Sequence, residues 1–297
     1  MHRVLLPFEF VEPTTIGEAV ELVDGGNARA LAGGVDLVLK MRLRQIVPDT
    51  VVSLQKVTGL DYVRADDSGL RFGALATLRQ IELSQVVNEE WPLLAEAIGS
   101  IASVQTKVMG TAVGNLCVGT PASDVALPLY ALGATVKLAR RSGEREIPIE
   151  EFFLDVGKTA VQPHEIVTEV FVPRQAARSS GAFLKLSKTS EDIAKVNIAV
   201  AVSVADGVCT EAKIALGSVA PTPIRAVEAE GLFRGREIRA GAIAGVAEEA
   251  GEAAAIAAAP ITDVRSTAAY RKEMVRILVR DALKRAAAEA LAGGGVS

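Results

Sequence analysis

The segment that most constrains the fold is residues 28–43, where a short apolar run meets two glycines and an apolar stretch with helical spacing follows. This order predicts a strand, a tight turn at Gly33-Gly34 and a helix starting at Val35. Two glycines admit a positive φ and leave no Cβ in the way of a bulky ligand. N–H groups at a helix start also attract phosphate. The stretch has neither the GxGxxG fingerprint nor a P-loop, so taken alone it favours a plain turn without a ligand.

The length and charge of the chain exclude several classes of protein. A chain of 297 residues is expected to form two or three subdomains with a sizeable core. The net charge of −4 is dispersed without a basic block, so no nucleic-acid partner is expected. Residues 1–10, which include Pro7 and Glu9, do not read as a secretory signal, and no apolar run is long enough for a membrane span. We therefore expect a cytoplasmic protein.

Cysteine and histidine are too few for most metal and nucleophilic chemistry. The chain has two cysteines, Cys117 and Cys209, and two histidines, His2 and His164, all far apart in sequence. This spacing excludes a CxxC pair, an iron–sulfur cluster held by this chain alone, and a Ser/His/Asp or Cys/His set. We predict no metal site and assign no catalytic residue, so redox chemistry here would require an organic cofactor.

Three successive segments differ in their predicted structure. Residues 1–56 and 57–174 each read as an α/β unit, and the first contains Thr15 and Glu18 at capping-box spacing before a helix. Residues 175–297 predict an antiparallel sheet of three strands followed by helices. The predicted strands are 182–187, 197–204 and 209–217, and the predicted helices begin at Thr222-Pro223, at residue 242 and at Asp263. The tail Gly293-Gly294-Gly295 is predicted to fray.

Residues 109–124 are rich in glycine and other small residues, with neither alternation nor a helical period. This composition predicts a long irregular loop, which in a compact domain is often functional and is otherwise a plain surface loop. Asp124 ends the stretch just before an apolar segment. Its carboxylate could either cap that segment as a helix or bind a ligand hydroxyl.

The order of several short motifs resembles the flavin subunits of molybdenum hydroxylases, a family that includes carbon monoxide dehydrogenase medium subunits and the flavin domain of xanthine dehydrogenase. The resemblance spans nearly the whole chain. Its motifs are Ala32-Gly33-Gly34-Val35-Asp36, Thr111 to Asn115 with Asp124, Phe152-Phe153 with Lys158-Thr159, Glu165-Ile166-Val167, Phe183 to Lys185, Asp192 to Val196, and Leu216 to Ala226.

The resemblance implies an α+β fold of two α/β FAD-binding subdomains followed by a C-terminal sheet with helices. It also implies an FAD site. The pyrophosphate would be cradled by Ala30, Leu31, Ala32, Gly33, Gly34, Val35, Asp36 and Leu37, and approached from the other side by Thr111, Ala112, Val113, Gly114 and Asn115. The remaining assignments are Asp124 at the ribose or adenine end, Lys185 near the isoalloxazine and Ile193 on the flavin face. Ile101 and Val167 would line the flavin ring or the adenine, and Ile166 is assigned to the site with them.

Two positions carry open alternatives. The family usually has Thr-x-Gly-Gly-Asn where this chain has Val113, which resists a positive φ. We therefore expect either a β-like backbone at Val113 or a more distant diphosphate, and a Val113→Gly change that preserves or tightens FAD binding. Lys185 would favour the anionic reduced flavin by charge attraction, or else only extend to solvent.

The function implied by the resemblance is that of an FAD-carrying electron-transfer subunit. A large molybdenum-cofactor subunit and a small subunit with [2Fe-2S] clusters would be its partners, in a dimer of heterotrimers. Two alternatives stay open: a free-standing FAD-dependent oxidoreductase with its own small-molecule substrate, and an interaction module that has lost FAD. The sequence identifies neither the substrate of the complex nor its electron acceptor.

Overall fold

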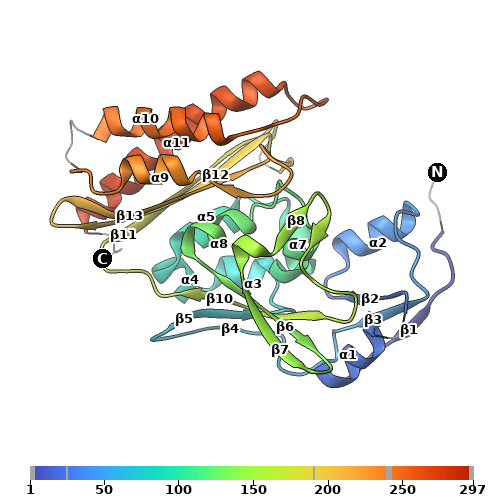
Figure 1. Ribbon diagram of the computed structural model, residues 1–297. Coiled ribbons are helices and arrows are strands. Elements are labelled where there is room, and N and C mark those ends of the chain that lie inside the picture. The colour runs from blue at the N-terminus through green and yellow to red at the C-terminus, as the bar shows by residue number, and fades with distance from the viewer. Residues whose placement is uncertain (1–3, 25, 190, 239–242, 294–297) are drawn as a thin grey trace.

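The computed structural model describes residues 4–24, 26–189, 191–238 and 243–293. A small sheet forms the N-terminal end, a five-stranded sheet with helices forms the middle, and a four-stranded sheet covered by helices forms the C-terminal region (Figure 1). The predicted α+β fold is therefore confirmed. The strands of each sheet fall within 1–56, 57–174 or 175–297, although the exact division at these residues stays a prediction.

The N-terminal region is built as the turn at Gly33-Gly34 predicts. Its elements are β1 (Glu9–Val11), α1 (Ile16–Val23), β2 (Ala28–Leu31), α2 (Val35–Arg42) and β3 (Thr50–Ser53). The three strands are parallel in the order β1-β3-β2. The capping box of Thr15 and Glu18 is present at the start of α1, because each side chain accepts a hydrogen bond from a backbone N–H that the helix leaves unpaired.

The middle region contains an antiparallel sheet in the order β4-β5-β10-β6-β7. Its strands are β4 (Val63–Asp66), β5 (Gly69–Gly73), β6 (Thr135–Arg140), β7 (Gly143–Pro148) and β10 (Ile166–Pro173). Its other elements are α3 (Leu78–Leu83), α4 (Gln85–Glu90), α5 (Pro92–Gly99), α6 (Val104–Met109), α7 (Ala112–Cys117), α8 (Ala126–Leu132), η1 (Ile149–Glu151), β8 (Phe153–Asp155) and β9 (Lys158–Thr159). The central strand β10 begins with Ile166 and Val167, two of the predicted site residues.

The prediction of an irregular loop over residues 109–124 is wrong in part, because helix α7 lies within this stretch. Thr111 caps this helix: its Oγ1 accepts a hydrogen bond from the Gly114 N–H at 3.0 Å. Ala112 and Leu116 are fully buried on the same side. A helix of six residues is too short to show a hydrophobic period, so the sequence pattern could not reveal it.

The described part of the C-terminal region contains a sheet of four strands rather than the three predicted. Its elements are β11 (Ser179–Leu186), β12 (Val196–Ala205), β13 (Val208–Gly217), β14 (Ile224–Arg225), α9 (Val227–Phe233), α10 (Ile243–Ala257) and α11 (Ala268–Ala292). Thr222-Pro223 does not start a helix. The next residues form β14 instead, because Ile224 and Arg225 pair with β13.

Helix α11 begins five residues later than predicted. Asp263 closes a turn before it, accepting hydrogen bonds from the N–H groups of Arg265 and Ser266, and Thr267 caps the helix. Gly293, in the left-handed region with φ of 115°, ends the helix. Of the tail predicted to fray, Gly294 and Gly295 lie outside the described residues.

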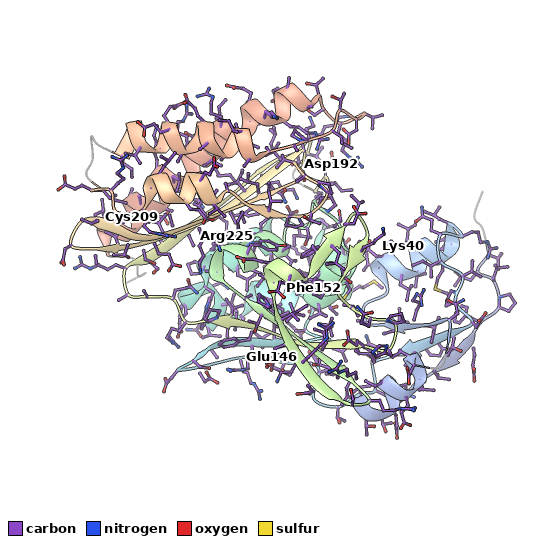
Figure 2. The ribbon with its side chains drawn as sticks, viewed as in Figure 1. Lys40, Glu146, Phe152, Asp192, Cys209 and Arg225 are labelled. Atoms are coloured by element: carbon purple, nitrogen blue, oxygen red, sulfur yellow. The ribbon has the colours of Figure 1, made fainter. Side chains whose placement is uncertain are left out.

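The C-terminal sheet joins two apolar cores through its alternating side chains. Ile198 and Val200 on β12 belong to the apolar core that contains residues of α9 to α11, whereas Ala199 belongs to the core that contains residues of α5 and α8. Figure 1 shows the sheet lying between these two layers of helices. Arg225, labelled in Figure 2, adds a polar link. Its Nη1 lies 2.7 Å from Oε1 of Glu150 in η1. The two regions therefore share one packed interface.

Candidate cofactor-binding site

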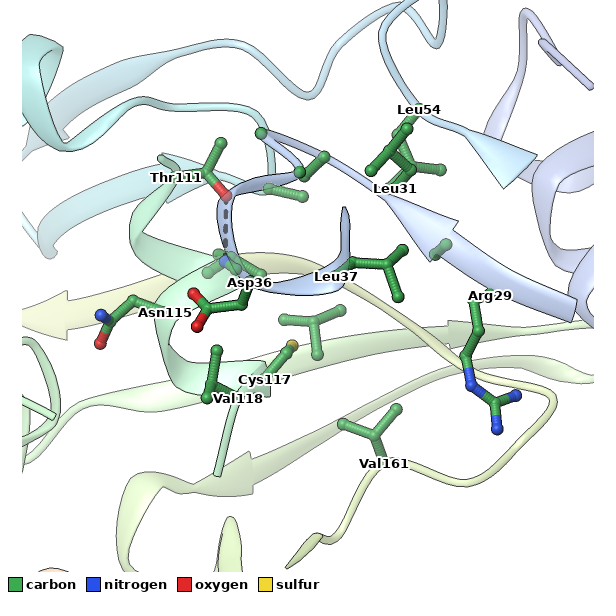
Figure 3. Close-up of a pocket in the computed structure, with 18 of the residues that line it drawn as sticks. Arg29, Leu31, Asp36, Leu37, Leu54, Thr111, Asn115, Cys117, Val118 and Val161 are labelled. Carbon is green, nitrogen blue, oxygen red and sulfur yellow. Dashed lines mark hydrogen bonds between the residues drawn. The ribbon is translucent and has the colours of Figure 1, made fainter. Parts of the chain in front are cut away.

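A cavity of about 500 Å³ opens between the turn that joins β2 to α2, helix α7 and residues 157–167 (Figure 3). It brings together residues from both predicted FAD loops. The predicted site residues that line it are Ala30, Leu31, Ala32, Gly33, Gly34, Val35, Asp36, Leu37, Ile101, Thr111, Val113, Gly114, Asn115, Ile166 and Val167. The structure therefore brings most of the predicted residues to one cavity, and their contact with FAD stays a prediction.

Four predicted residues do not line the cavity. Ala112 is fully buried, and its N–H donates to the Ala76 carbonyl at 3.2 Å. Ile193 lies on the connection between β11 and β12 with 59% of its surface exposed. The other two, Asp124 and Lys185, contact each other behind the cavity wall. An FAD contact of these four side chains is not supported by this cavity.

Asp124 and Lys185 form a buried ion pair, with 2.7 Å between Oδ2 and Nζ and side chains 9% and 7% exposed. Asn197 donates to Asp124 Oδ1 at 2.7 Å, and Lys185 donates to the Ser100 carbonyl at 3.1 Å. Burial raises the pKa of the Asp124 carboxyl, against the lowering effect of Lys185 and Asn197.

This pairing corrects three expectations. Two residues in contact cannot serve opposite ends of an extended cofactor, so Asp124 at the ribose or adenine and Lys185 at the isoalloxazine cannot both hold. Lys185 does not extend to solvent. Asp124 does not cap α8 either, because the Ala126 N–H donates to Ser123 Oγ instead, at 3.1 Å.

The start of α2 presents unpaired donors to the cavity. Gly34, its N-cap residue, has φ of 74° and no side chain to cap the helix. The first helical hydrogen bond joins the Val38 N–H to the Gly34 carbonyl at 3.0 Å. The N–H groups of Val35, Asp36 and Leu37 precede it and have no intrahelical acceptor. Together with the helix dipole they form a site for an anion.

Gly33 is required for a different reason than ligand access. A Cβ on Gly33 would lie 1.9 Å from the Met109 carbonyl oxygen at the end of α6. The missing side chain therefore lets the two cofactor loops pack against each other. A Cβ on Gly34 would instead meet Leu31 at 3.2 Å, and its need for glycine comes mainly from the positive φ.

Val113 lies in the helical backbone of α7, so no positive φ is required and the β-like alternative is wrong. The other alternative, a more distant diphosphate, stays a prediction. Ala112 and Gly114 use their N–H groups within the protein. The Val113 N–H has no acceptor among the residues that the structure describes. The second loop therefore offers fewer free donors to an anion than the start of α2.

Charged and polar side chains line both ends of the cavity. Arg29 lies at one end and Asn115 at the other, with Asp36 near Asn115 (Figure 3). Lys40 of α2 also lines the cavity. Sequence reasoning missed Arg29 and Lys40 as site residues, although the signal was present: Arg29 interrupts an apolar strand just before the glycine turn, and Lys40 lies within the helix that follows it.

Glu165 lines the cavity but is held by Arg145. The guanidinium donates two hydrogen bonds to its carboxylate, both at 2.7 Å, and this bonding lowers the pKa of Glu165. Cys117 lines the cavity with an exposed side chain, and desolvation by the surrounding atoms raises the pKa of its thiol. Cys117 is therefore a neutral thiol at neutral pH. The ion pair of Glu165 with Arg145 stabilises this wall of the cavity.

The fold and site define an α+β protein in which an uncapped helix start, suited to an anion, faces a cavity. Residues 6–175 match the FAD binding domain in molybdopterin dehydrogenase, and residues 181–286 match the CO dehydrogenase flavoprotein C-terminal domain. The chain belongs to this family of FAD-binding subunits of molybdopterin dehydrogenases. It is an oxidoreductase subunit with FAD as its cofactor.

Relatives match the chain almost from end to end. The carbon monoxide dehydrogenase medium chain of Hydrogenophaga pseudoflava is 31% identical over 281 residues, covering 94% of this chain and 96% of the relative. The glyceraldehyde dehydrogenase medium chain of Sulfolobus acidocaldarius is 29% identical over 281 residues, covering 94% and 98%. A solved structure of carbon monoxide dehydrogenase from Hydrogenophaga pseudoflava, lacking the Mo-pyranopterin moiety, superposes with a TM-score of 0.91 at 31% identity, covering 97% of this chain and 99% of that one.

Proposed function

We propose that this medium subunit holds FAD in the cavity between α2 and α7 and passes electrons from iron–sulfur clusters of a partner subunit to an external acceptor. The observation that carries the proposal is the composition of the cavity. An uncapped helix start and two cations lie within one cavity that also has apolar walls. These walls include Leu31, Leu54 and Val161.

The donor set fits a diphosphate flanked by ring systems and hydroxyls. The N–H groups of Val35 to Leu37 suit the diphosphate, and Arg29 and Lys40 add positive charge. The side chains of Asp36 and Asn115 suit hydroxyl groups, because a carboxylate and an amide both accept hydrogen bonds. Aliphatic walls exclude water from planar rings.

Bound FAD supplies the ability to take up and release electrons singly or in pairs, and the chain's own residues bind and orient it. Three ionisable side chains at or behind the cavity are poorly placed for acid–base chemistry. Glu165 is ion-paired, Cys117 is neutral, and Lys185 is bound to Asp124. Substrate chemistry would therefore take place on a partner.

The partners we propose are a large molybdenum-cofactor subunit and a small subunit with [2Fe-2S] clusters, in a dimer of heterotrimers. Relatives named medium chains match nearly the whole length of this chain, which supports a subunit role. Exposed apolar side chains on α6, on α2 and at the residue after α2 also suit a covered surface: Val108, Met109, Leu39 and Leu43. Among the described helices, none is long and apolar enough to cross a membrane. A cytoplasmic location stays a prediction.

Reconstitution tests this function. The full chain with FAD is expected to show flavin absorbance, and its flavin should be reduced by the reduced iron–sulfur partner and reoxidised by an added acceptor. Stopped-flow absorbance would follow both steps. A folded chain that does not retain FAD would contradict the proposed site. Flavin reduction by a small-molecule substrate without partners would instead support a free-standing enzyme.

A further inference from the structure

Gln55 holds the first cofactor loop from outside the cavity. Its Nε2 donates to the Ala32 carbonyl at 3.0 Å, just after the Leu54 N–H donates to the Leu31 carbonyl at 2.9 Å. The Gln55 side chain thus extends the β2–β3 pairing by one hydrogen bond into the turn. Sequence reasoning gave Gln55 no role.

Gln55 approaches the loop from the side opposite the FAD cavity. A second cavity of about 620 Å³ is lined by Gln55 and Met109, whereas Gln55 does not line the first. Ala32 and Gly33 line both cavities, so their peptide forms the wall between them. In a planar trans peptide the C=O and N–H point in opposite directions. With the Ala32 oxygen turned to Gln55, the Gly33 N–H is directed to the FAD cavity.

The glycines make this orientation worth restraining. A peptide next to glycine can rotate at little steric cost, because glycine adopts both signs of φ. The rotated peptide would turn the negative end of a carbonyl dipole toward an anionic ligand, where an N–H donor is required. Van der Waals contact with Met109 limits the position of Gly33, but only the Gln55 hydrogen bond, among the described residues, acts on the Ala32 carbonyl.

We propose that Gln55 is a positioning residue for FAD: it orients the Ala32–Gly33 peptide so that the N–H faces the cofactor diphosphate. This inference rests on the proposed placement of FAD in the first cavity. It concerns a side chain outside the glycine motif that does not line the cofactor cavity.

Two variants of the full chain test the proposal. Gln55→Leu removes the donor without adding charge, and Gln55→Glu keeps the shape but accepts instead of donating. Both are expected to weaken FAD binding by about three- to tenfold, the scale of one net hydrogen bond. Flavin fluorescence quenching measures the dissociation constant. Without FAD, both Gln55 variants should have the same melting midpoint as the control variant Gln175→Leu.

Gln175→Leu is the matched control. Gln175 also donates from Nε2 to backbone carbonyls, those of Leu132 at 3.2 Å and Pro173 at 2.7 Å, but it does not line the FAD cavity. The Gln175→Leu variant should bind FAD with the same affinity as the unmodified chain. If Gln55→Leu binds FAD with unchanged affinity, the inference is overturned. This holds even if Gln55→Glu binds FAD more weakly, because a loss of affinity in that variant alone would be an effect of its added charge. A lower melting midpoint of the FAD-free Gln55→Leu chain than of the FAD-free control would also overturn the inference, because weaker FAD binding would then reflect a general loss of stability. Failure of the unmodified chain to bind FAD would contradict the proposed site instead.

Discussion

At the scale of single residues, the two glycines of the first loop have separate tasks. Gly33 allows the loop to touch the backbone of Met109, and Gly34 allows the left-handed start of α2. Only the second task is visible in sequence, because a turn before a helix is a local signal. The task of Gly33 depends on a contact with Met109, which lies 76 positions further along the chain.

Gly33→Ala is expected to lower FAD affinity more than tenfold, because its Cβ would force the loop away from the Met109 carbonyl. A Cβ so close to backbone cannot be accommodated by a side-chain rotation. Equilibrium FAD titration of the full chain measures the effect. Gly231→Ala in α9 is the control, since a Cβ there meets nothing within 4 Å. Equal FAD affinity in Gly33→Ala and the control would show that the two loops need not touch.

Val113→Gly is expected to destabilise the chain rather than to improve FAD binding. Val113 is helical and 4% exposed, so glycine costs about 1 kcal/mol in helix propensity and further free energy from the lost side-chain packing. Urea unfolding of the FAD-free protein measures the change, and Val113→Ala separates packing from propensity. A Val113→Gly chain of unchanged stability and tighter FAD binding would restore the original interpretation.

At the scale of elements, local chemistry predicted the N-terminal region well and pairing over long distances limited the rest. The capping box of α1 and the turn before α2 are encoded within a few residues. Strand β14 is not, because two residues become a strand only through partners on β13. Helix α7 contains small residues without a period, so its cap at Thr111 was its sole local signal. Most residues of the predicted site line one cavity, although their binding of FAD stays a prediction. No sequence signal indicated that Asp124 and Lys185 pair with each other, because that contact is tertiary.

The segment before β10 is braced by the ion pair of Glu165 and Arg145, which predicts a pH dependence. The folded-state pKa of Glu165 lies below its usual 4.5, so the pair's contribution is fully present above pH 4.5. It is lost as the pH falls through the lower, folded-state pKa. Melting midpoints of the unmodified chain and Glu165→Gln should therefore differ at neutral pH and converge on acidification. A difference independent of pH would show that the charge of Glu165 does not matter.

At the scale of the whole molecule, buried polar groups join the FAD-binding region to the C-terminal sheet directly behind the cavity. Ser100 and Asp124 lie on one side, and Lys185 and Asn197 on the other. Asn197 in turn accepts a hydrogen bond from Ser218 at 3.1 Å, and a Cβ on Gly217 would lie 2.3 Å from its oxygen. Ile101 and Asn115 connect this network to the cavity, one by chain adjacency to Ser100 and the other through its 2.6 Å hydrogen bond to Ser123. The position of the C-terminal region and the shape of the cavity are therefore linked.

The ion pair at the centre of this network predicts a non-additive response to mutation. Asp124→Asn leaves the buried ammonium of Lys185 without its counter-charge and should cost about 3–5 kcal/mol of unfolding free energy. Adding Lys185→Met removes that uncompensated charge, so the double variant should be more stable than Asp124→Asn alone. Chemical denaturation of the four chains completes the cycle. Asp155→Asn, which breaks the exposed pair with Lys158, is the control and should cost at most about 1 kcal/mol. Additive losses at Asp124 and Lys185 would mean that the pair does not couple the two regions.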